Sequence, residues 1–336
     1  MQAHGYRYIF GPVMSGRLGR SLGLDLLGAR VCSMNCVYCE SGALAHLTLA
    51  RAPYVPAAEL LGELARWEAA RKGADEPLPE VVTLGGLGEP TLNSAMPEII
   101  QGVRRILPGV PVAVLTNASL MTEAAVRAEL AQADIVLPSL DALVPAEFAA
   151  VNRAHPGLET AGGVGAIADG ILAFRRDSQA KLYLEILLVA GVNDSARNLE
   201  LLAEYCNRLQ PDRVDVVTLS RPGTEAAARP VDTGTLAHWR ARLGTVREST
   251  TRHAGPKLAV CVKSGHKQGG GMLPAELLRT RILASLTRRP QTAAQLAEAL
   301  LAEEGAVTAE LAALLDAGQI MAREQDGQDY YQARTQ

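Results

Sequence analysis

Short apolar runs alternate with alanine- and leucine-rich stretches through most of this chain. The runs are typical of buried strands and lie at 23–27, 81–85, 111–115, 134–138, 182–189 and 214–219. The stretches between them have the spacing of amphipathic helices, at 57–72, 94–107, 122–132, 160–175, 196–209 and 233–247. Strand followed by helix, repeated in this way, predicts an α/β fold with a parallel sheet. We expect a partial (β/α)6 barrel of the TIM-like type, with a doubly wound open sheet as the alternative.

The pattern changes after about residue 266. Three consecutive glycines at 269–271 indicate a flexible connection, and helix-like stretches follow at 275–288, 292–301 and 308–317. Asp326-Gly327, between two short β-rich runs at 320–323 and 329–332, is a strong hairpin signal. We therefore expect a barrel domain over 1–266, a linker over 267–273 and a small C-terminal winged-helix domain over 274–336.

Composition and charge limit where in the cell the protein is expected and which partners it is expected to bind. The 336 residues are 48% hydrophobic and carry a net charge of −3, which gives no bulk electrostatic case for nucleic acid. Residues 272–336 contain six Lys or Arg and nine Asp or Glu, so the expected winged helix is poorly equipped for phosphate contacts. No apolar run is long enough to span a bilayer, and the first residues lack the apolar core of a signal peptide. We expect a cytoplasmic, reducing location.

Three of the five cysteines, Cys32, Cys36 and Cys39, lie within eight residues. Their thiolates can reach three irons of one [4Fe–4S] cluster and leave the fourth iron open for a substrate or cofactor. Zinc is the alternative, but structural zinc prefers four ligands in two spaced pairs, and disulfides are rare in a reducing compartment. The remaining cysteines, Cys206 and Cys261, lie in apolar patterns, and we expect both to pack in the core.

Polar or glycine-rich segments follow the predicted strands. Because barrels place their chemistry at the carboxyl ends of the strands, we expect these segments to meet at one rim. A tight turn or a helix cap is the structural alternative for several of them. Glu185 lies inside an apolar strand and must be paired or face the interior, either in a structural ion pair or as a substrate contact. The rim candidates are Gly85, Gly86, Gly88, Glu89, Asn117, Ser139 and Asp141.

The Cys-x3-Cys-x2-Cys run resembles the cluster loop of radical S-adenosylmethionine (SAM) enzymes. The resemblance implies the partial-barrel fold, a [4Fe–4S] cluster on Cys32, Cys36 and Cys39, and SAM chelated by the open iron. It also implies reductive cleavage of SAM to a 5′-deoxyadenosyl radical, with the protein supplying binding and orientation. In the family an aromatic residue lies beside the adenine, where this chain has Tyr38.

The resemblance extends to the rim segments. The segment from Gly85 to Glu89 corresponds to the one that holds the amino end of SAM. Asn117, Ser139 and Asp141 resemble positions that contact the ribose hydroxyls or the methionine carboxylate.

Residues 6–225 resemble a narrower subgroup, which is related to the tricyclic-base enzyme of wybutosine synthesis. Residues 14–17 depart from the subgroup, which usually has a second proline and paired basic residues there. The extra cysteines and the lysine of the wybutosine enzyme have no counterpart that we can place, so its reaction is not transferred. The shared motifs lie at 6–25, 88–92, 139–142, 152–156, 191–195 and 221–222.

Four further residues have two interpretations each. Arg17 and Arg20 stand close before the first predicted strand, where they can hold a carboxylate or phosphate or form salt bridges that fix the N-terminus. His155 and His266 can act in acid–base chemistry or substrate binding, but surface or capping roles are the more ordinary ones.

The cysteine spacing and the resemblance together imply an oxidoreductase-type radical SAM enzyme that abstracts hydrogen from an unidentified substrate. An RNA base, a peptide and a small metabolite all stay open, and a flavodoxin- or ferredoxin-like protein is expected to donate the electron. Two alternatives remain. One is a zinc-stabilised regulatory protein that uses its winged helix on nucleic acid, and the other is a barrel that binds a partner without turnover.

Overall fold

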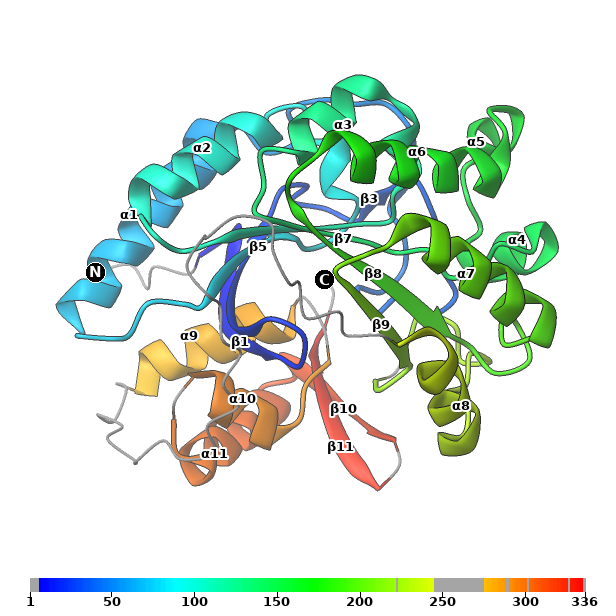
Figure 1. Ribbon diagram of the computed structural model, residues 1–336. Coiled ribbons are helices and arrows are strands. Elements are labelled where there is room, and N and C mark those ends of the chain that lie inside the picture. Colours follow the sequence, from blue (N-terminus) through cyan, green and yellow to red (C-terminus); the bar gives the residue numbers. More distant parts are fainter. Residues whose placement is uncertain are drawn as a thin grey trace.

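A seven-stranded sheet forms the centre of the computed structural model, which describes residues 6–221, 223–244, 275–287, 290–300, 302–325 and 327–334 (Figure 1). The strand order is β1-β2-β5-β6-β7-β8-β9. Strand β1 is antiparallel to β2, and all the other neighbours in this sheet are parallel. The bounds are β1 Ile9–Ser15, β2 Gly19–Asp25, β5 Val81–Gly85, β6 Val112–Thr116, β7 Ile135–Pro138, β8 Lys181–Leu188 and β9 Arg213–Thr218.

The parallel strands follow one another in chain order, without the reversal that a doubly wound sheet requires. This strand order is that of a partial α/β barrel with a mostly parallel sheet. Strands β1 and β9 are its two edge strands. Helices form an arc along the outer side of the sheet (Figure 1). They are α1 Ala57–Gly73, α2 Met96–Ile106, α3 Ala124–Leu130, α4 Pro145–Asn152, α5 Pro156–Thr160, α6 Gly163–Asp177, α7 Ala196–Leu209 and α8 Thr233–Leu243.

Local sequence explains where several helices begin. The Ser195 hydroxyl accepts from the N–H of Asn198 at 3.1 Å and starts α7, and Asp232 accepts from the N–H of Thr235 at 2.9 Å and starts α8. All six predicted strands and all six predicted helices in this region are present, with shifts of a few residues at their ends.

Strand β1 was not predicted, because Gly11, Pro12 and Ser15 give its sequence little strand character. Tertiary contacts stabilise its start: the N–H groups of Tyr8 and Ile9 both donate to Glu63 Oε1, at 2.7 and 2.9 Å. The short turn between β1 and β2 then brings Leu18 against the apolar side chains at the amino ends of β5, β6 and β7.

One small two-stranded sheet and two 3₁₀ turns complete the rim. Strands β3 Val31–Cys32 and β4 His46–Leu47 pair in parallel within the long connection from β2 to α1. The turns η1 Pro90–Leu92 and η2 Ser119–Thr122 follow β5 and β6.

The C-terminal part contains α9 Ala275–Leu286, α10 Ala293–Leu300, α11 Glu304–Asp316 and the hairpin β10 Ile320–Gln325 with β11 Gln328–Ala333. These elements, the expected three helices and hairpin, have their own apolar core. Arg281 pairs with Glu76 at 2.9 Å, and the Tyr330 hydroxyl donates to Ser220 O at 2.9 Å, so this part packs against the main sheet.

Some expectations lie outside the described residues: the linker at 267–273, Cys261 and His266. In the described ranges, we find no helix with both the length and the apolar character needed to cross a membrane.

Candidate functional site

The cysteine-bearing loop lies between β2 and α1, and backbone hydrogen bonds fix it to the end of α4. The N–H of Asn35 donates to Asn152 O at 3.1 Å, and that of Val37 donates to Val151 O at 3.0 Å. In the other direction, the N–H of His155 donates to the carbonyl of Ser33 at 2.9 Å. Three such bonds hold the backbone around the cysteines in one conformation.

The segment after β9 holds the other end of the same loop. Thr224 donates to the carbonyl of Cys39 through both its N–H, at 2.9 Å, and its hydroxyl, at 2.7 Å. Arg221 pairs with Glu40 at 3.2 Å and also donates to Gln295 of α10 at 3.4 Å. The cysteine loop is therefore in contact with strand ends from both halves of the sheet.

The thiols of Cys32, Cys36 and Cys39 are partly buried, and two of them accept hydrogen bonds from side-chain amides. Asn117 Nδ2 lies 3.4 Å from Cys32 Sγ, and Asn152 Nδ2 lies 3.5 Å from Cys36 Sγ. Burial, aided by the charge of the nearby Glu89, raises the pKa of Cys32 to about 12. Such a thiol ionises only when a bound cation compensates the charge.

These residues fit an iron–sulfur cluster. Within the described ranges, no three His, Cys, Asp or Glu side chains gather closely enough to hold a single metal ion. A [4Fe–4S] cube requires no such convergence, because each of its cysteine ligands binds a different iron. Amide donors to cysteine sulfur are also one of the features that set the potential of such clusters. The donor set and its surroundings are therefore those that a three-cysteine cluster needs.

Glu89 is a buried brace between the glycine-rich segment and the end of β6. Its Oε1 accepts from the Thr91 N–H, the Thr91 hydroxyl and the Thr116 hydroxyl, at 3.1, 2.6 and 2.7 Å. Its Oε2 accepts from the N–H of Asn117 at 2.7 Å. Burial raises the pKa of Glu89, and these hydrogen bonds act against that shift. The carboxylate is thus fully used inside the protein, and it positions Asn117 against Cys32.

The glycines after β5 are not equivalent. Gly86 has φ +105°, a left-handed conformation that disfavours other residues. A Cβ at Gly88 would stand 1.7 Å from the carbonyl oxygen of Val31, whereas one at Gly85 would meet only Leu115 Cβ at 3.9 Å. The absence of a side chain at Gly88 therefore lets this segment approach the strand that carries Cys32.

Tyr38 and Asp141 meet directly. The Tyr38 hydroxyl donates to Asp141 Oδ2 at 2.5 Å, and the same oxygen accepts from Asn152 Nδ2 at 2.7 Å. The other carboxylate oxygen accepts from the N–H of Leu187 at 2.9 Å. Burial raises the pKa of Asp141, and the three hydrogen bonds oppose that rise. Asp141 thus links the cysteine loop to α4 and β8.

Ser139 lies beside these residues, where it pairs with Glu185 through an isolated β-bridge and donates its N–H to Thr116 O at 2.9 Å. Its side chain is half-buried, and its hydroxyl makes no hydrogen bond to any described residue. Of the predicted rim residues with polar side chains, it is the one left open to a ligand.

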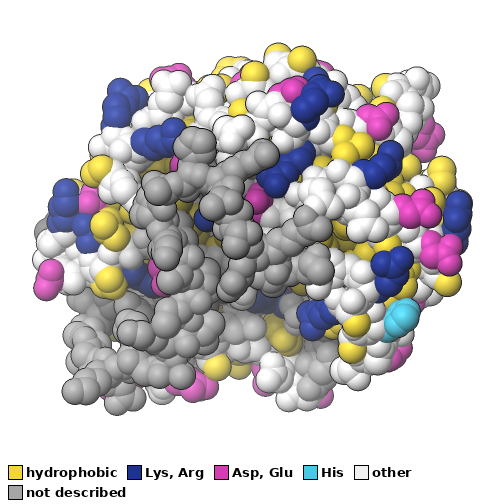
Figure 2. Space-filling model, viewed as in Figure 1, with side chains coloured by type: hydrophobic (Ala, Val, Ile, Leu, Met, Phe, Trp, Pro, Cys, Tyr) yellow, Lys and Arg dark blue, Asp and Glu magenta, His cyan; other side chains and the backbone are white. Residues whose placement is uncertain are grey.

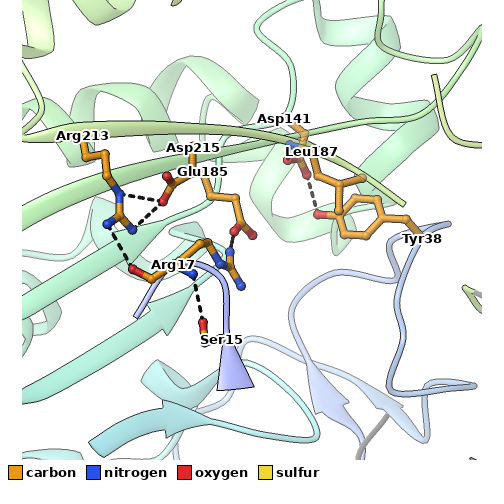
Figure 3. A network of polar contacts seen from close by, with 8 residues as sticks. All are labelled: Ser15, Arg17, Tyr38, Asp141, Glu185, Leu187, Arg213 and Asp215. Atoms are coloured by element: carbon orange, nitrogen blue, oxygen red, sulfur yellow. Dashed lines mark hydrogen bonds and ion pairs between the residues drawn. The ribbon is translucent and has the colours of Figure 1, made fainter. Parts of the chain in front are cut away.

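A charged network lies on the inner face of β8 and β9 (Figure 3). The guanidinium of Arg17, at the β1–β2 turn, meets the carboxylate of Glu185. Arg213 pairs with Asp215 at 2.7 Å and donates to the carbonyl of Arg17 at 3.1 Å. Arg17 therefore forms a salt bridge, which is one of its two expected roles. Arg20 is buried and donates to two backbone carbonyls of the loop before β5, at 3.0 and 3.2 Å.

Several residues of the site were not predicted individually, although two of them lie in motifs noted above. Asn152 begins the 152–156 motif and contacts both Asp141 and Cys36. Asn193, in the 191–195 motif, donates to the carbonyls of Asp141 and Leu187, at 2.9 and 2.8 Å. His155 accepts from the Gly157 N–H at 3.0 Å and caps α5, which confirms the capping interpretation.

Charged side chains are mixed on the face shown in Figure 2. Lys and Arg alternate with Asp and Glu across the described part of that face, and no basic stripe gathers there. Cys206, on α7, is half-buried and packs against the main core, as expected for a small apolar residue.

The sequence is similar to one family model and to several known proteins. The model of the radical SAM superfamily matches residues 27–202. A UPF0026 protein from Helicobacter pylori is 36% identical over 222 residues, which cover 66% of this chain and 69% of that protein. UPF0026 protein slr1464 from Synechocystis is also 36% identical, over 218 residues that cover 64% of this chain and 76% of that protein. A protein named GTPase Obg, from Brachyspira hyodysenteriae, is 32% identical, but the chain spans only 32% of its length.

Two solved structures are similar at lower identity. A radical SAM methyltransferase from Sphaerobacter thermophilus gives a TM-score of 0.49 at 19% identity, covering 66% of this chain and 62% of that one. Archaeal TYW1 gives a TM-score of 0.43 at 15% identity, covering 66% and 70%.

Proposed function

The chain belongs to the radical SAM superfamily and to the UPF0026 family, and on this premise we propose that Cys32, Cys36 and Cys39 bind a [4Fe–4S] cluster and that SAM binds beside it. Enzymes of this superfamily use both groups. One observation carries the proposal: the three cysteines lie on a single fixed loop, and two of their sulfurs already accept amide N–H groups.

When bound, the cluster and SAM supply a one-electron cleavage of the sulfonium that yields methionine and a 5′-deoxyadenosyl radical able to abstract hydrogen from a substrate. The chain itself provides position and seclusion. Glu89 fixes Asn117, which donates toward Cys32. Asp141 orients Tyr38, whose ring would lie beside the adenine. The Ser139 hydroxyl would contact a polar group of SAM.

We also propose roles for the glycine-rich segment and for the C-terminal part. Gly85, Gly86 and Gly88 would let backbone groups approach the amino end of SAM. The proposed domains are a barrel over 1–266, a linker over 267–273 and a winged helix over 274–336, supported by the three helices and hairpin. A flavodoxin- or ferredoxin-like protein would supply the electron.

Anaerobic reconstitution of the full chain tests the cluster assignment. We expect the parent to bind about four irons with four sulfides and to form 5′-deoxyadenosine from SAM under dithionite. Cys32→Ala should lose most of the iron and all of the product, because one cluster ligand is missing.

Cys206→Ala is the matched control, since Cys206 is a half-buried thiol near the end of α7 and outside the cysteine loop, and it should behave like the parent. Equal iron and equal 5′-deoxyadenosine in Cys32→Ala would contradict the proposal. Zinc in place of iron in the anaerobically purified parent would favour the zinc-stabilised regulatory protein.

A further inference from the structure

The inner face of the sheet is unevenly filled. On β5 and β7 every residue is buried, and the inward side chains of Val81, Ala113, Ile135 and Leu137 form an apolar cluster with Leu18. On β8 the burial alternates, so that the inward residues Tyr183, Glu185 and Leu187 are only half-buried while their neighbours are covered. In strand register, Tyr183 pairs with Arg213 and Glu185 with Asp215. The interior next to β8 and β9 is therefore accessible to solvent and lined by charge.

Arg17 and Glu185 meet on this partly exposed side of the interior. Arg17 comes from the β1–β2 turn, at the amino end of β2, and Leu18 beside it packs on the apolar cluster. The side chains of Arg17 and Glu185 are 31% and 17% exposed, respectively. Arg213 is already engaged by Asp215, by the Arg17 carbonyl and by the Tyr183 ring, 4.0 Å below its guanidinium carbon. Within the described chain, the Arg17 guanidinium and the Glu185 carboxylate have only each other as hydrogen-bond or ion-pair partners.

This pair lies one inward-facing residue along β8 from the contact that links the strand to the cysteine loop. Glu185 and Leu187 are two residues apart on β8 and share a face, so they are separated by about 7 Å along the strand. The Leu187 N–H donates to Asp141, which holds Tyr38 of the cysteine loop. Figure 3 shows Glu185 and Leu187 on the same strand, with Tyr38 on the side of Leu187 and Arg17 on the side of Glu185. A molecule between the two would reach both the ion pair and the region beside the cysteines.

The charge balance of the pair selects the class of ligand. A singly charged anion at Arg17 would displace Glu185 and leave its carboxylate partly buried and unpaired. A singly charged cation at Glu185 would likewise leave the Arg17 guanidinium without a partner. An unpaired charge away from water is costly. A molecule with both charges can engage both residues and leave neither without a partner.

We propose that Arg17 and Glu185 form the substrate-binding floor of the site and that they bind a small zwitterion through its carboxylate and its ammonium group. The inference rests on the proposed function, and it narrows the substrate to a metabolite of amino-acid type.

Three probes with one carbon skeleton test the inference on the reconstituted full chain. They are L-alanine, N-acetyl-L-alanine and L-alaninamide, which carry both charges, the negative charge alone and the positive charge alone. Saturating SAM is present throughout, so that the amino-acid part of the cofactor's own site is filled. We expect L-alanine to bind about tenfold more tightly than either singly charged probe, as measured by equilibrium dialysis.

Variants of the pair should reverse this order. Glu185→Gln leaves Arg17 without its anion and should prefer N-acetyl-L-alanine, whereas Arg17→Gln should prefer L-alaninamide. Arg104→Gln, which breaks a surface ion pair with Asp134, should keep the parental order and serves as the control. If a single variant does not fold, Arg17→Gln with Glu185→Gln removes both charges and should bind the three probes equally.

Equal affinity of the parent for all three probes would overturn the inference. The same order of affinities in the parent and in the variants would also overturn it. Iron content and 5′-deoxyadenosine are measured on the same samples. If the protein binds no iron and forms no 5′-deoxyadenosine but the variants still reverse the probe order, the proposed function is wrong and the zwitterion site remains. Failure of the probe reversal with intact SAM cleavage would do the opposite.

Discussion

The two halves of the sheet handle polar groups in opposite ways. Around β5, β6 and β7 the inner face is apolar, and the polar side chain of Glu89 at the rim is saturated by four internal hydrogen bonds. Around β8 and β9 the inner face carries Glu185, Arg213 and Asp215, half-buried and paired with one another or with Arg17.

The difference indicates a division of labour. Satisfied, buried polar groups fix geometry, because each loses much when a partner is removed. Mostly buried ion pairs contribute little net stability, because the cost of taking both charges out of water offsets their attraction, and they can exchange partners. The first half therefore fixes Asn117 against the cysteine loop, and the inner face of the second is suited to receiving a ligand. Three sets of variants test this contrast.

The largest effect is expected at Gly88. Gly88→Ala places a Cβ against the carbonyl oxygen of Val31, so the rim must shift, and we expect a loss of about 4 kcal/mol in the free energy of unfolding. Gly85→Ala is the matched control, because its Cβ finds an ordinary contact, and it should cost less than about 0.5 kcal/mol. Urea unfolding of both variants measures this difference, and equal losses would show that the close approach at Gly88 is unimportant.

Glu89→Ala should come next. The change leaves the N–H groups of Thr91 and Asn117 and the hydroxyl of Thr116 without their acceptor, and we expect a loss of about 3 kcal/mol. A carboxylate that served only as a SAM contact would give another result, namely unchanged unfolding and weaker SAM binding. Unfolding of the apo-protein together with SAM titration of the reconstituted protein separates the two roles.

The smallest contrast compares two inward leucines. Leu137→Ala, on the filled side, should cost about 2.5 kcal/mol, because the surrounding cluster is closed and a cavity remains. Leu187→Ala, on the accessible side, should cost about 1 kcal/mol, because solvent fills the space. Thermal unfolding of the two variants gives the comparison. A larger loss for Leu187→Ala would mean that the β8–β9 side is as tightly packed as the other.

Local pattern determined much of the framework. The alternation of apolar runs and helical stretches located all six parallel strands of the sheet, since strands covered on both faces must be apolar along their length. The spacing of Cys32, Cys36 and Cys39, and the family resemblance it carries, indicated the chemistry. Strand β1 escaped detection because its stability comes from Glu63 and from pairing with β2, neither of which is encoded in its own residues.

The roles of the rim residues required the tertiary structure. Glu89 and Asp141 were expected beside SAM, and that prediction stays open. Both carboxylates accept internal hydrogen bonds, a fact that depends on which strand ends become neighbours. The meeting of Arg17 with Glu185 likewise depends on strand register and on which face of β8 points inward. The sequence alone thus determined most elements of the framework and which chemistry the cysteines favour. Only the packing of the sheet decided which polar groups brace the site and which stay accessible, because burial and pairing are set by neighbours that lie far apart along the chain.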